Sequence, residues 1–323
     1  MRESANDPIS PVWRFSNSLS TVTLSERDTP SAGSAFFKGH GLGNDYLVFE
    51  DGDDWVLDPG RIVAVCDRWR GPGSDGIVLL ESRTEQPFPL RMFNPDGSEF
   101  ERSGNGLRIL AAYLAREGLV NDEPFDVCVG GDTVQLHVLA PPERGLYDVS
   151  AEMGRAGHGP GAVGLDAAAL DVDQRLDLGD AGSHVIHPVS IGNPHAVVFP
   201  AEWSPELIDQ IGPEISGHPA FADGTNVQVA RVLDEGTLQA RIWERGVGPT
   251  SASGTSACAV AAAAVNSGRA APGRFEVRMD GGSMQIDVTE GMEITLTGPV
   301  QEVSGGTLTK GFLEFLVLKS SRA

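Results

Sequence analysis

Two halves of the chain carry the same residues in the same order, and this repetition restricts the possible folds more than any other feature. In each half an asparagine follows a short apolar segment, at Asn44 and at Asn193. A serine followed by glycine comes 59 positions after the first asparagine, at Ser103, and 60 positions after the second, at Ser253. Matched spacing of this kind indicates a duplicated structural unit. We therefore expect two α/β units that present equivalent loops.

Each serine also follows, by nine residues, a polar residue that ends an apolar strand-like run: Asn94 in the first half and Glu244 in the second. After Ser103, apolar residues recur at helical spacing and the run ends at Gly118. After Ser253, the segment 257–265 is apolar on nearly every side. That pattern predicts a helix buried along the axis of a domain.

Short alternating runs between these markers predict strands, at 134–139, 238–243, 274–279, 284–288 and 293–296. The predicted fold is α/β (α+β), with two pseudo-symmetric domains, each a mostly antiparallel twisted sheet or barrel around a central helix. We assign residues 1–34 to a flexible N-terminal extension, 35–155 to the first domain and 156–300 to the second. Residues 301–323 are expected to form a strand that returns to the first domain.

The acidic composition excludes several classes of partner. The 323 residues include 45 Asp and Glu against 24 Lys and Arg, a formal net charge of -21. Such a surface repels nucleic-acid phosphates and anionic lipids, so neither nucleic acid nor membrane is expected as a partner. No stretch approaches 18 consecutive apolar residues, which argues against a transmembrane helix.

The cysteines fit a reducing compartment. Cys66, Cys128 and Cys258 are odd in number and far apart, which matches neither a disulfide framework nor a zinc site. We therefore expect a cytoplasmic protein without a bound metal.

A serine before glycine at a helix start lies among backbone N–H groups that have no partner inside the helix. The helix dipole adds positive potential there, so the position binds a carboxylate or phosphate. One such serine is most simply explained as an N-cap. Two in matched loops favour a site, with Ser103 and Ser253 facing each other across an anionic ligand.

Five ordered motifs between about residues 36 and 308 resemble those of diaminopimelate epimerases. They are KGHGLGND at 38–45, NPDGSEFERSGNGLR at 94–108, GNPH at 192–195, GTNV at 224–227 and ERGVGPTSASGTSACA at 244–259. The resemblance implies an isomerase without pyridoxal phosphate, other cofactor or metal. In that family one thiolate removes the α-proton of an amino acid and a second thiol returns a proton on the opposite face.

Carried over position by position, the resemblance assigns roles to twelve residues. The catalytic positions fall on Ser103 and Ser253. The reacting carboxylate would be held by Gly104, Asn105, Gly254 and Thr255. The remainder of the substrate, notably a distal amino-carboxylate end, would be bound by Asn44, Asn94, Asn193, Asn226, Glu244 and Arg245. The implied reaction converts LL- to meso-diaminopimelate or epimerises a related amino acid, and a homodimer is consistent with the resemblance.

The chain departs from the family pattern at the two catalytic positions, where serine stands in place of cysteine. Pro249 and Ser256 also replace a usual Glu and Gly, and Cys258 is expected to be a core residue. Serine is the weaker acid by about five pKa units, so its alkoxide costs ~7 kcal/mol more, which corresponds to about five orders of magnitude in rate. A neighbouring base could offset part of this cost, and His195 is a candidate, with Glu244 and His40.

Three functions are therefore compatible with the sequence. The first is an amino-acid epimerase or racemase that works with two serines. The second is a different isomerase or lyase on the same scaffold, acting on a more acidic carbon acid. The third is a catalytically silent amino-acid-binding protein.

Overall fold

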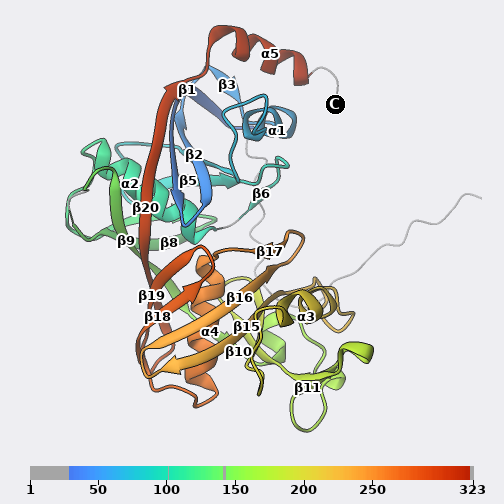
Figure 1. Ribbon diagram of the computed structural model, residues 1–323. Coiled ribbons are helices and arrows are strands. Elements are labelled where there is room, and N and C mark those ends of the chain that lie inside the picture. The colour runs from blue at the N-terminus through green and yellow to red at the C-terminus, as the bar shows by residue number, and fades with distance from the viewer. Residues whose placement is uncertain (1–28, 101, 141–142, 321–323) are drawn as a thin grey trace, which may run out of the picture.

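A computed structural model describes residues 29–100, 102–140 and 143–320 and shows two domains that lie one above the other in Figure 1. The first domain contains β1 (Ser31–Gly41), β2 (Asn44–Asp51), β3 (Trp55–Val56), α1 (Pro59–Cys66), β4 (Ile77–Leu80), β5 (Phe88–Phe93), β6 (Glu99–Phe100), α2 (Gly104–Arg116), β7 (Phe125–Val129), β8 (Asp132–Val138) and β9 (Leu146–Arg155). The second contains β10 (Gly157–His158), β11 (Arg175–Asp177), β12 (Ser183–Val185), β13 (His187–Ser190), β14 (Pro194–Val198), α3 (Leu207–Ser216), β15 (Asn226–Asp234), β16 (Thr237–Glu244), β17 (Gly248–Thr250), α4 (Gly254–Asn266), β18 (Gly273–Met279) and β19 (Gly282–Val288). The chain then continues through β20 (Glu293–Thr307) into α5 (Lys310–Ser320).

The strands of the first domain close into a ring. Pairing runs β1–β2–β4–β5–β7–β8–β9–β20 and returns from β20 to β1. Only the β2–β4 and β5–β7 pairs of this ring are parallel. The helix α2 lies within the ring, because most of its residues are buried against the barrel strands.

The second domain repeats this plan. Its strands pair in the order β10–β13–β14–β15–β16–β18–β19–β20, and β20 pairs with β9, which leads directly into β10. The two parallel pairs recur at equivalent places, as β14–β15 and β16–β18. The apolar helix α4 is buried in the centre of the domain. The predicted fold class and the duplication are thus confirmed.

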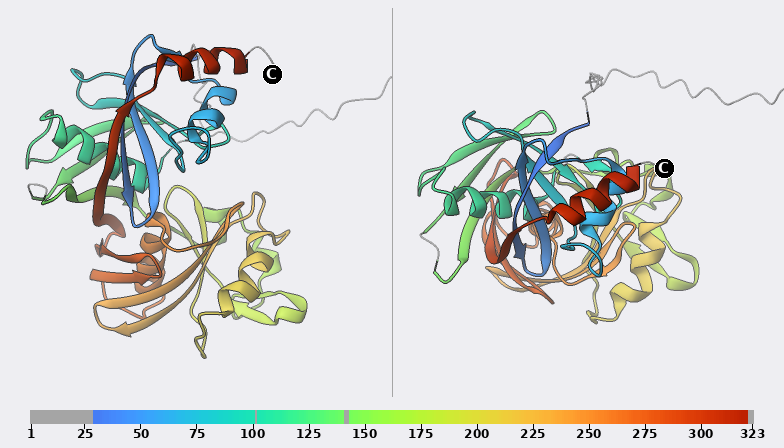
Figure 2. Two further views of the ribbon diagram at one scale, coloured as in Figure 1. Left: turned by 45° about the horizontal axis from the view of Figure 1, so that its top comes forward. Right: turned by 90° about the horizontal axis from the view of Figure 1, so that it is seen from above.

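Two long strands connect the domains. The first part of β20 pairs with β19 of the second domain, and its last part pairs with β1 of the first. Along most of its length β20 also pairs with β9. Figures 1 and 2 show β20 passing from one domain into the other. The expected boundary at residue 300 therefore falls within a strand that belongs to both barrels.

The expected ends of the chain need correction. Residues 1–28 of the expected extension lie outside the described residues, but residues 31–34 begin β1, where Ala32 is fully buried beside Phe49 and Trp55. The C-terminal segment is a helix, α5, and not a strand beyond Thr307. Its apolar run suits either structure; here Leu316 is buried in the cluster that also contains Ile62 of α1. Figure 2 shows α5 at the end of the first domain that is remote from the second.

Candidate active site

A cavity of about 250 Å³ lies between the domains, where the N-terminal ends of the two central helices meet it. All twelve residues that the sequence assigned to catalysis or binding line this cavity: Asn44, Asn94, Ser103, Gly104, Asn105, Asn193, Asn226, Glu244, Arg245, Ser253, Gly254 and Thr255. They come from both halves of the chain. The duplication therefore brings two equivalent loops to one space.

One leucine side chain shows how closely the two helix starts approach each other. A β-carbon added to Gly104 would lie 3.2 Å from Cδ2 of Leu296, and one added to Gly254 would lie 3.0 Å from the same atom. Leu296 is fully buried in β20, the strand that both barrels share. Glycine at both positions allows α2 and α4 to begin on either side of this side chain.

Ser103 is an N-cap whose hydroxyl has neutral partners. Its oxygen accepts a hydrogen bond from the backbone N–H of Gly106, with an N–O distance of 3.2 Å. Its hydroxyl is also hydrogen-bonded to that of Tyr46. Burial raises the pKa of Tyr46 to about 12, against a smaller lowering by the bond to Ser103. The phenol is therefore protonated at neutral pH.

Ser253 has an acidic partner instead. Its side chain makes no capping bond to the backbone of α4 and is hydrogen-bonded to the Glu244 side chain, which also bonds to the Thr250 side chain. Burial raises the pKa of Glu244, and these two bonds lower it in part. A carboxylate with a raised pKa is the more basic one, so Glu244 is suited to accept the Ser253 proton.

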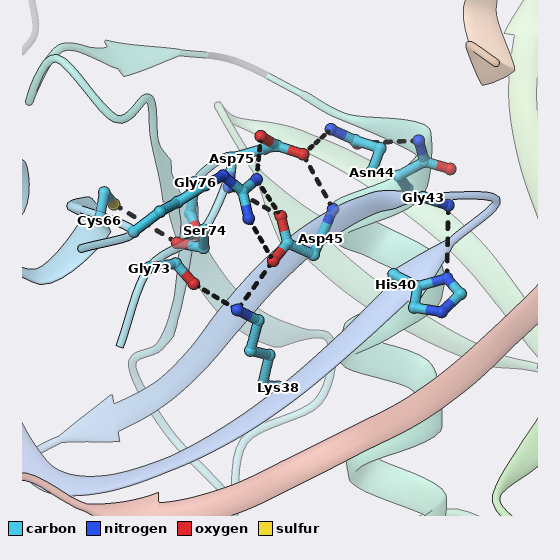
Figure 3. Close-up of polar contacts among 12 residues, drawn as sticks. Lys38, His40, Gly43, Asn44, Asp45, Cys66, Gly73, Ser74, Asp75 and Gly76 are labelled. Atoms are coloured by element: carbon cyan, nitrogen blue, oxygen red, sulfur yellow. Dashed lines mark hydrogen bonds and ion pairs between the residues drawn. The ribbon is translucent and has the colours of Figure 1, made fainter. Parts of the chain in front are cut away.

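The wall contributed by the first half is held by a network of charges (Figure 3). Asn44 Nδ2 donates to an Asp75 carboxylate oxygen at 3.0 Å. Burial by itself would raise the pKa of Asp45, but hydrogen bonds from Arg68 and Lys38 outweigh it and bring the pKa to about 2. Lys38 Nζ lies 2.9 Å from the Asp45 carboxylate. The network holds Asn44 at the cavity.

The opposite wall is fixed mainly by backbone groups. Asn226 Nδ2 donates to the Pro194 carbonyl at 3.0 Å, and Asn226 Oδ1 accepts from the Arg245 backbone N–H at 3.0 Å. The Arg245 guanidinium donates to the Asp223 carbonyl at 2.7 Å. Arg245 thus brings a cation to the cavity, as expected for an acidic protein with an anionic ligand.

His195, the expected auxiliary base, does not line the cavity. It is fully buried, with Nε2 at 2.9 Å from Asn193 Oδ1 and Nδ1 at 3.0 Å from Gln228 Nε2. Burial lowers its pKa to about 3, which the bond to Gln228 partly opposes. Both ring nitrogens are engaged, so the histidine orients Asn193 and is not placed to take a substrate proton.

Five lining residues were missed: Tyr46, Phe100, Arg102, Thr250 and Ala252. The repeat itself could have identified Tyr46, which follows Asn44 by two positions as His195 follows Asn193. Arg102 makes no ion pair with any residue that the structure describes. It also lines an adjoining cavity of about 730 Å³, together with Asn193 and Arg245. Two arginines, one from each domain, therefore line both cavities.

Among the described residues, no group of three or more His, Cys, Asp or Glu side chains is arranged to hold a metal ion. The helices of the same residues include none that combines the length and apolar character needed to cross a bilayer.

Comparisons with known proteins agree with the geometry. A family model described as diaminopimelate epimerase matches residues 36–158 and 188–303. A curated diaminopimelate epimerase 2 of Nostoc sp. is 38% identical over 276 residues, which cover 85% of this chain and 95% of the relative. A diaminopimelate epimerase of Desulforudis audaxviator is 40% identical over 275 residues, covering 84% and 98% of the two chains.

Solved structures share the fold at low sequence identity. A predicted epimerase from Pseudomonas aeruginosa has a TM-score of 0.60 at 19% identity and covers 86% of this chain and 100% of its own. A probable proline racemase from Agrobacterium radiobacter has a TM-score of 0.61 at 16% identity, covering 85% and 93%. From the family match and the two relatives, the chain belongs to the diaminopimelate epimerase family.

Proposed function

We propose that the protein epimerises the α-carbon of LL-diaminopimelate, or of a closely related amino acid, to give the meso form without a cofactor. The observation that carries this proposal is the convergence on one cavity of two helix starts, each preceded by a serine, and ten further binding residues. The family's name supplies the substrate class. The site supplies the means of removing and returning a proton.

The negative charge of the reaction develops at the α-carbon and its carboxylate. Backbone N–H groups at the starts of α2 and α4 border the cavity at Gly104, Asn105, Gly254 and Thr255. Such groups stabilise an enediolate without having to reorganise during the reaction. The two helix dipoles add to this effect, each equivalent to about half a positive charge.

The base on one face is Ser253. Its oxygen takes the α-proton while its own hydroxyl proton passes to Glu244, so no free alkoxide has to form. The ~7 kcal/mol cost of a serine alkoxide is thereby reduced on this face. Burial raises the pKa of Glu244, and its interaction with the Ser253 side chain lowers it in part.

Ser103 returns a proton to the opposite face of the enediolate. The oxygen left behind is stabilised by hydrogen bonds from Tyr46 and from the Gly106 N–H. Glu244 then releases its extra proton to water and Ser103 regains one from water, which restores the starting state. This face contains no carboxylate at hydrogen-bond distance from its serine among the described residues. The transition state in which Ser103 exchanges a proton with the substrate is therefore less stabilised than the one at Ser253.

The distal amino-carboxylate end binds among Asn94, Asn193, Asn226 and Arg245, which line the same cavity. Arg102 adds a second guanidinium on the side of the first domain. Bidentate Arg–carboxylate contacts combine energy with geometric specificity.

We also place the activity in the cytoplasm, since Cys66, Cys128 and Cys258 are all free.

Solvent deuterium incorporation tests the function. The protein is incubated with LL- or meso-diaminopimelate in heavy water, and the α-proton is followed by NMR beside the Ser103→Cys/Ser253→Cys variant. Exchange with inversion by the unmodified protein is the expected result. Exchange only in the cysteine variant would mean a silent binding protein that has lost its bases. Exchange in neither would direct the search to other carbon acids.

A further inference from the structure

Arg108 is a buried cation for which the reaction described above has no role. It lies on α2, one turn after Gly104, and its side chain has no exposed surface. None of the ion pairs among the described residues includes it. Burial lowers its pKa to about 10, so it remains charged at neutral pH. Attraction by Asp148 opposes this lowering only in part. A buried charge outside any ion pair is unfavourable, so its presence needs an explanation.

The surrounding structure accommodates this guanidinium with neutral oxygens. Nε donates to the Gly104 carbonyl at 3.3 Å, Nη1 donates to the Pro299 carbonyl at 3.2 Å, and Nη2 donates to the Asn105 side-chain oxygen. Glycines provide the space, because a β-carbon at Gly41 would lie 2.9 Å from Nη2 and one at Gly298 would lie 2.5 Å from Nη1. Strands β1 and β20 thus both leave room for the charged group.

The contact with Asn105 links this cation to the cavity. A guanidinium can only donate, so the Asn105 oxygen faces Arg108 and its Nδ2 points the other way. That Nδ2 donates to Asn44 Oδ1 at 2.8 Å, and Asn44 Nδ2 donates to Asp75 at 3.0 Å (Figure 3). A carboxylate can only accept, so Asp75 requires the same orientation from its end. A cation and an anion together fix both amides that line the first wall of the cavity.

The same position places a full positive charge beneath the start of α2. Gly104 and Asn105, whose oxygens it contacts, both line the cavity. The positive charge of Arg108 also lowers the pKa of Cys258 in α4, against the larger raising by burial, so this charge acts on the second central helix as well. Electrostatic interactions are strong in such a poorly solvated region. An enediolate carries more negative charge than the bound carboxylate, so this cation favours the transition state over the ground state.

We infer that Arg108 is a positioning residue that orients Asn105 and places beneath the start of α2 a positive charge that stabilises the enediolate formed in the cavity. This inference rests on the proposed function. The reaction generates a negative charge that this cation attracts, and the effect reaches the substrate through Asn105 and the start of α2.

The test compares Arg108→Lys, which keeps the charge, with Arg108→Gln, which keeps hydrogen-bonding capacity but not the charge. Arg116→Gln is the matched control, since Arg116 ends the same helix and pairs with Glu302. We expect Arg108→Gln to lower kcat by about 100-fold with KM changed by less than about 3-fold, a loss comparable to that of one oxyanion donor. The kcat of Arg108→Lys should remain within about 10-fold of that of the unmodified protein. The kcat of Arg116→Gln should equal that of the unmodified protein. Equal losses in the Lys and Gln variants, or a loss confined to thermal stability, would overturn the inference.

If Arg108→Gln does not fold, Asn105→Asp provides the second measurement. The new carboxylate would pair with Arg108, so the melting temperature should not fall, while kcat should drop by about 100-fold because the cation is neutralised. A lower melting temperature with an unchanged kcat would contradict the assignment. Calorimetry with meso-diaminopimelate distinguishes failure of the proposed function from failure of the role assigned to Arg108. Absence of both binding and exchange in the unmodified protein refutes the proposed function, whereas binding unaffected by Arg108→Gln alongside normal turnover refutes only the role of Arg108.

Discussion

Ser103 and Ser253 begin helices at equivalent points of the two barrels, but the groups around their hydroxyls differ. Ser103 caps the backbone of its helix and is hydrogen-bonded to the neutral phenol of Tyr46. Ser253 caps no backbone group and is hydrogen-bonded to the carboxyl group of Glu244. The backbone that receives the substrate is duplicated, whereas the proton-accepting groups are not.

The repeat shows where this difference arises. Nine residues before each serine stands Asn94 in one half and Glu244 in the other, and both line the cavity. Two residues after the paired asparagines stand Tyr46, at the cavity, and His195, buried behind it. The first half therefore has a phenol where the second has an imidazole, and an amide where the second has a carboxylate. The two halves share their backbone geometry, and these differences in side chains make one face the more basic.

Removing the carboxylate from the second half should have the largest effect. Glu244→Gln keeps the size and hydrogen bonds of the side chain but cannot accept the Ser253 proton. We expect kcat to fall by at least about 100-fold, the usual contribution of a general base. Steady-state epimerisation measures this loss, with Glu143→Gln, on the exposed surface, as control. An unchanged kcat would remove Glu244 from the mechanism.

The next largest effect should come from replacing one serine at a time by cysteine, which compares the two bases directly. A thiol ionises near pH 8.5 and needs less help from a neighbouring base than a hydroxyl does. Ser103→Cys should therefore raise kcat at least about 10-fold more than Ser253→Cys, because Ser253 already has Glu244 beside it. The comparison requires both variants to be assayed in both reaction directions. Equal gains would mean that the two faces are chemically alike.

Acid should destabilise the second half through His195. Its folded pKa of about 3 lies below the usual 6.5, so the stability that it contributes is present above pH 6.5 and is lost as the pH falls toward 3. Between pH 7 and pH 5 this group alone should cost about 2 kcal/mol. Urea unfolding at both pH values measures the loss, and His195→Gln should show less of it. An identical pH dependence in that variant would contradict the assignment.

The smallest effect is expected at Tyr46, the residue of the first half that corresponds to His195. Tyr46→Phe removes one hydrogen bond to Ser103 and leaves the ring packing in place. We expect a loss of about 1 kcal/mol in stability, and of about 10-fold in kcat if that bond stabilises the transition state. Thermal unfolding and steady-state kinetics give both values. A loss in kcat as large as that of Glu244→Gln would show that the phenol is itself an essential proton donor.

The sequence was sufficient to predict the duplication and both central helices, because these depend on spacing along the chain. The twelve residues at the cavity came from the motifs that resemble those of diaminopimelate epimerases. The sequence was insufficient where tertiary packing decides. The apolar run in α5 suits a strand as well as a helix, and only burial of Leu316 against α1 distinguishes them. His195 looked like a base because its partners, Asn193 and Gln228, come together only in the folded sheet.

Arg102 and Arg108 illustrate the same limit in the first domain. Nothing in the spacing separates an arginine that lines the cavity from one that is buried beneath it, since both flank the same Ser-Gly-Asn-Gly motif. The difference is set by the direction of α2. Arg102 precedes the helix, whereas Arg108 lies on its buried side, one turn in.

The most direct test of unequal bases is α-proton exchange by Ser103→Ala and Ser253→Ala in heavy water, with each stereoisomer of diaminopimelate followed separately by NMR. Neither variant should invert the α-carbon. Ser103→Ala, which keeps Ser253 and Glu244, should still exchange the α-proton of one stereoisomer with retention, whereas Ser253→Ala should exchange neither at a comparable rate. Equal residual exchange in the two variants, or inversion by either of them, would contradict the account.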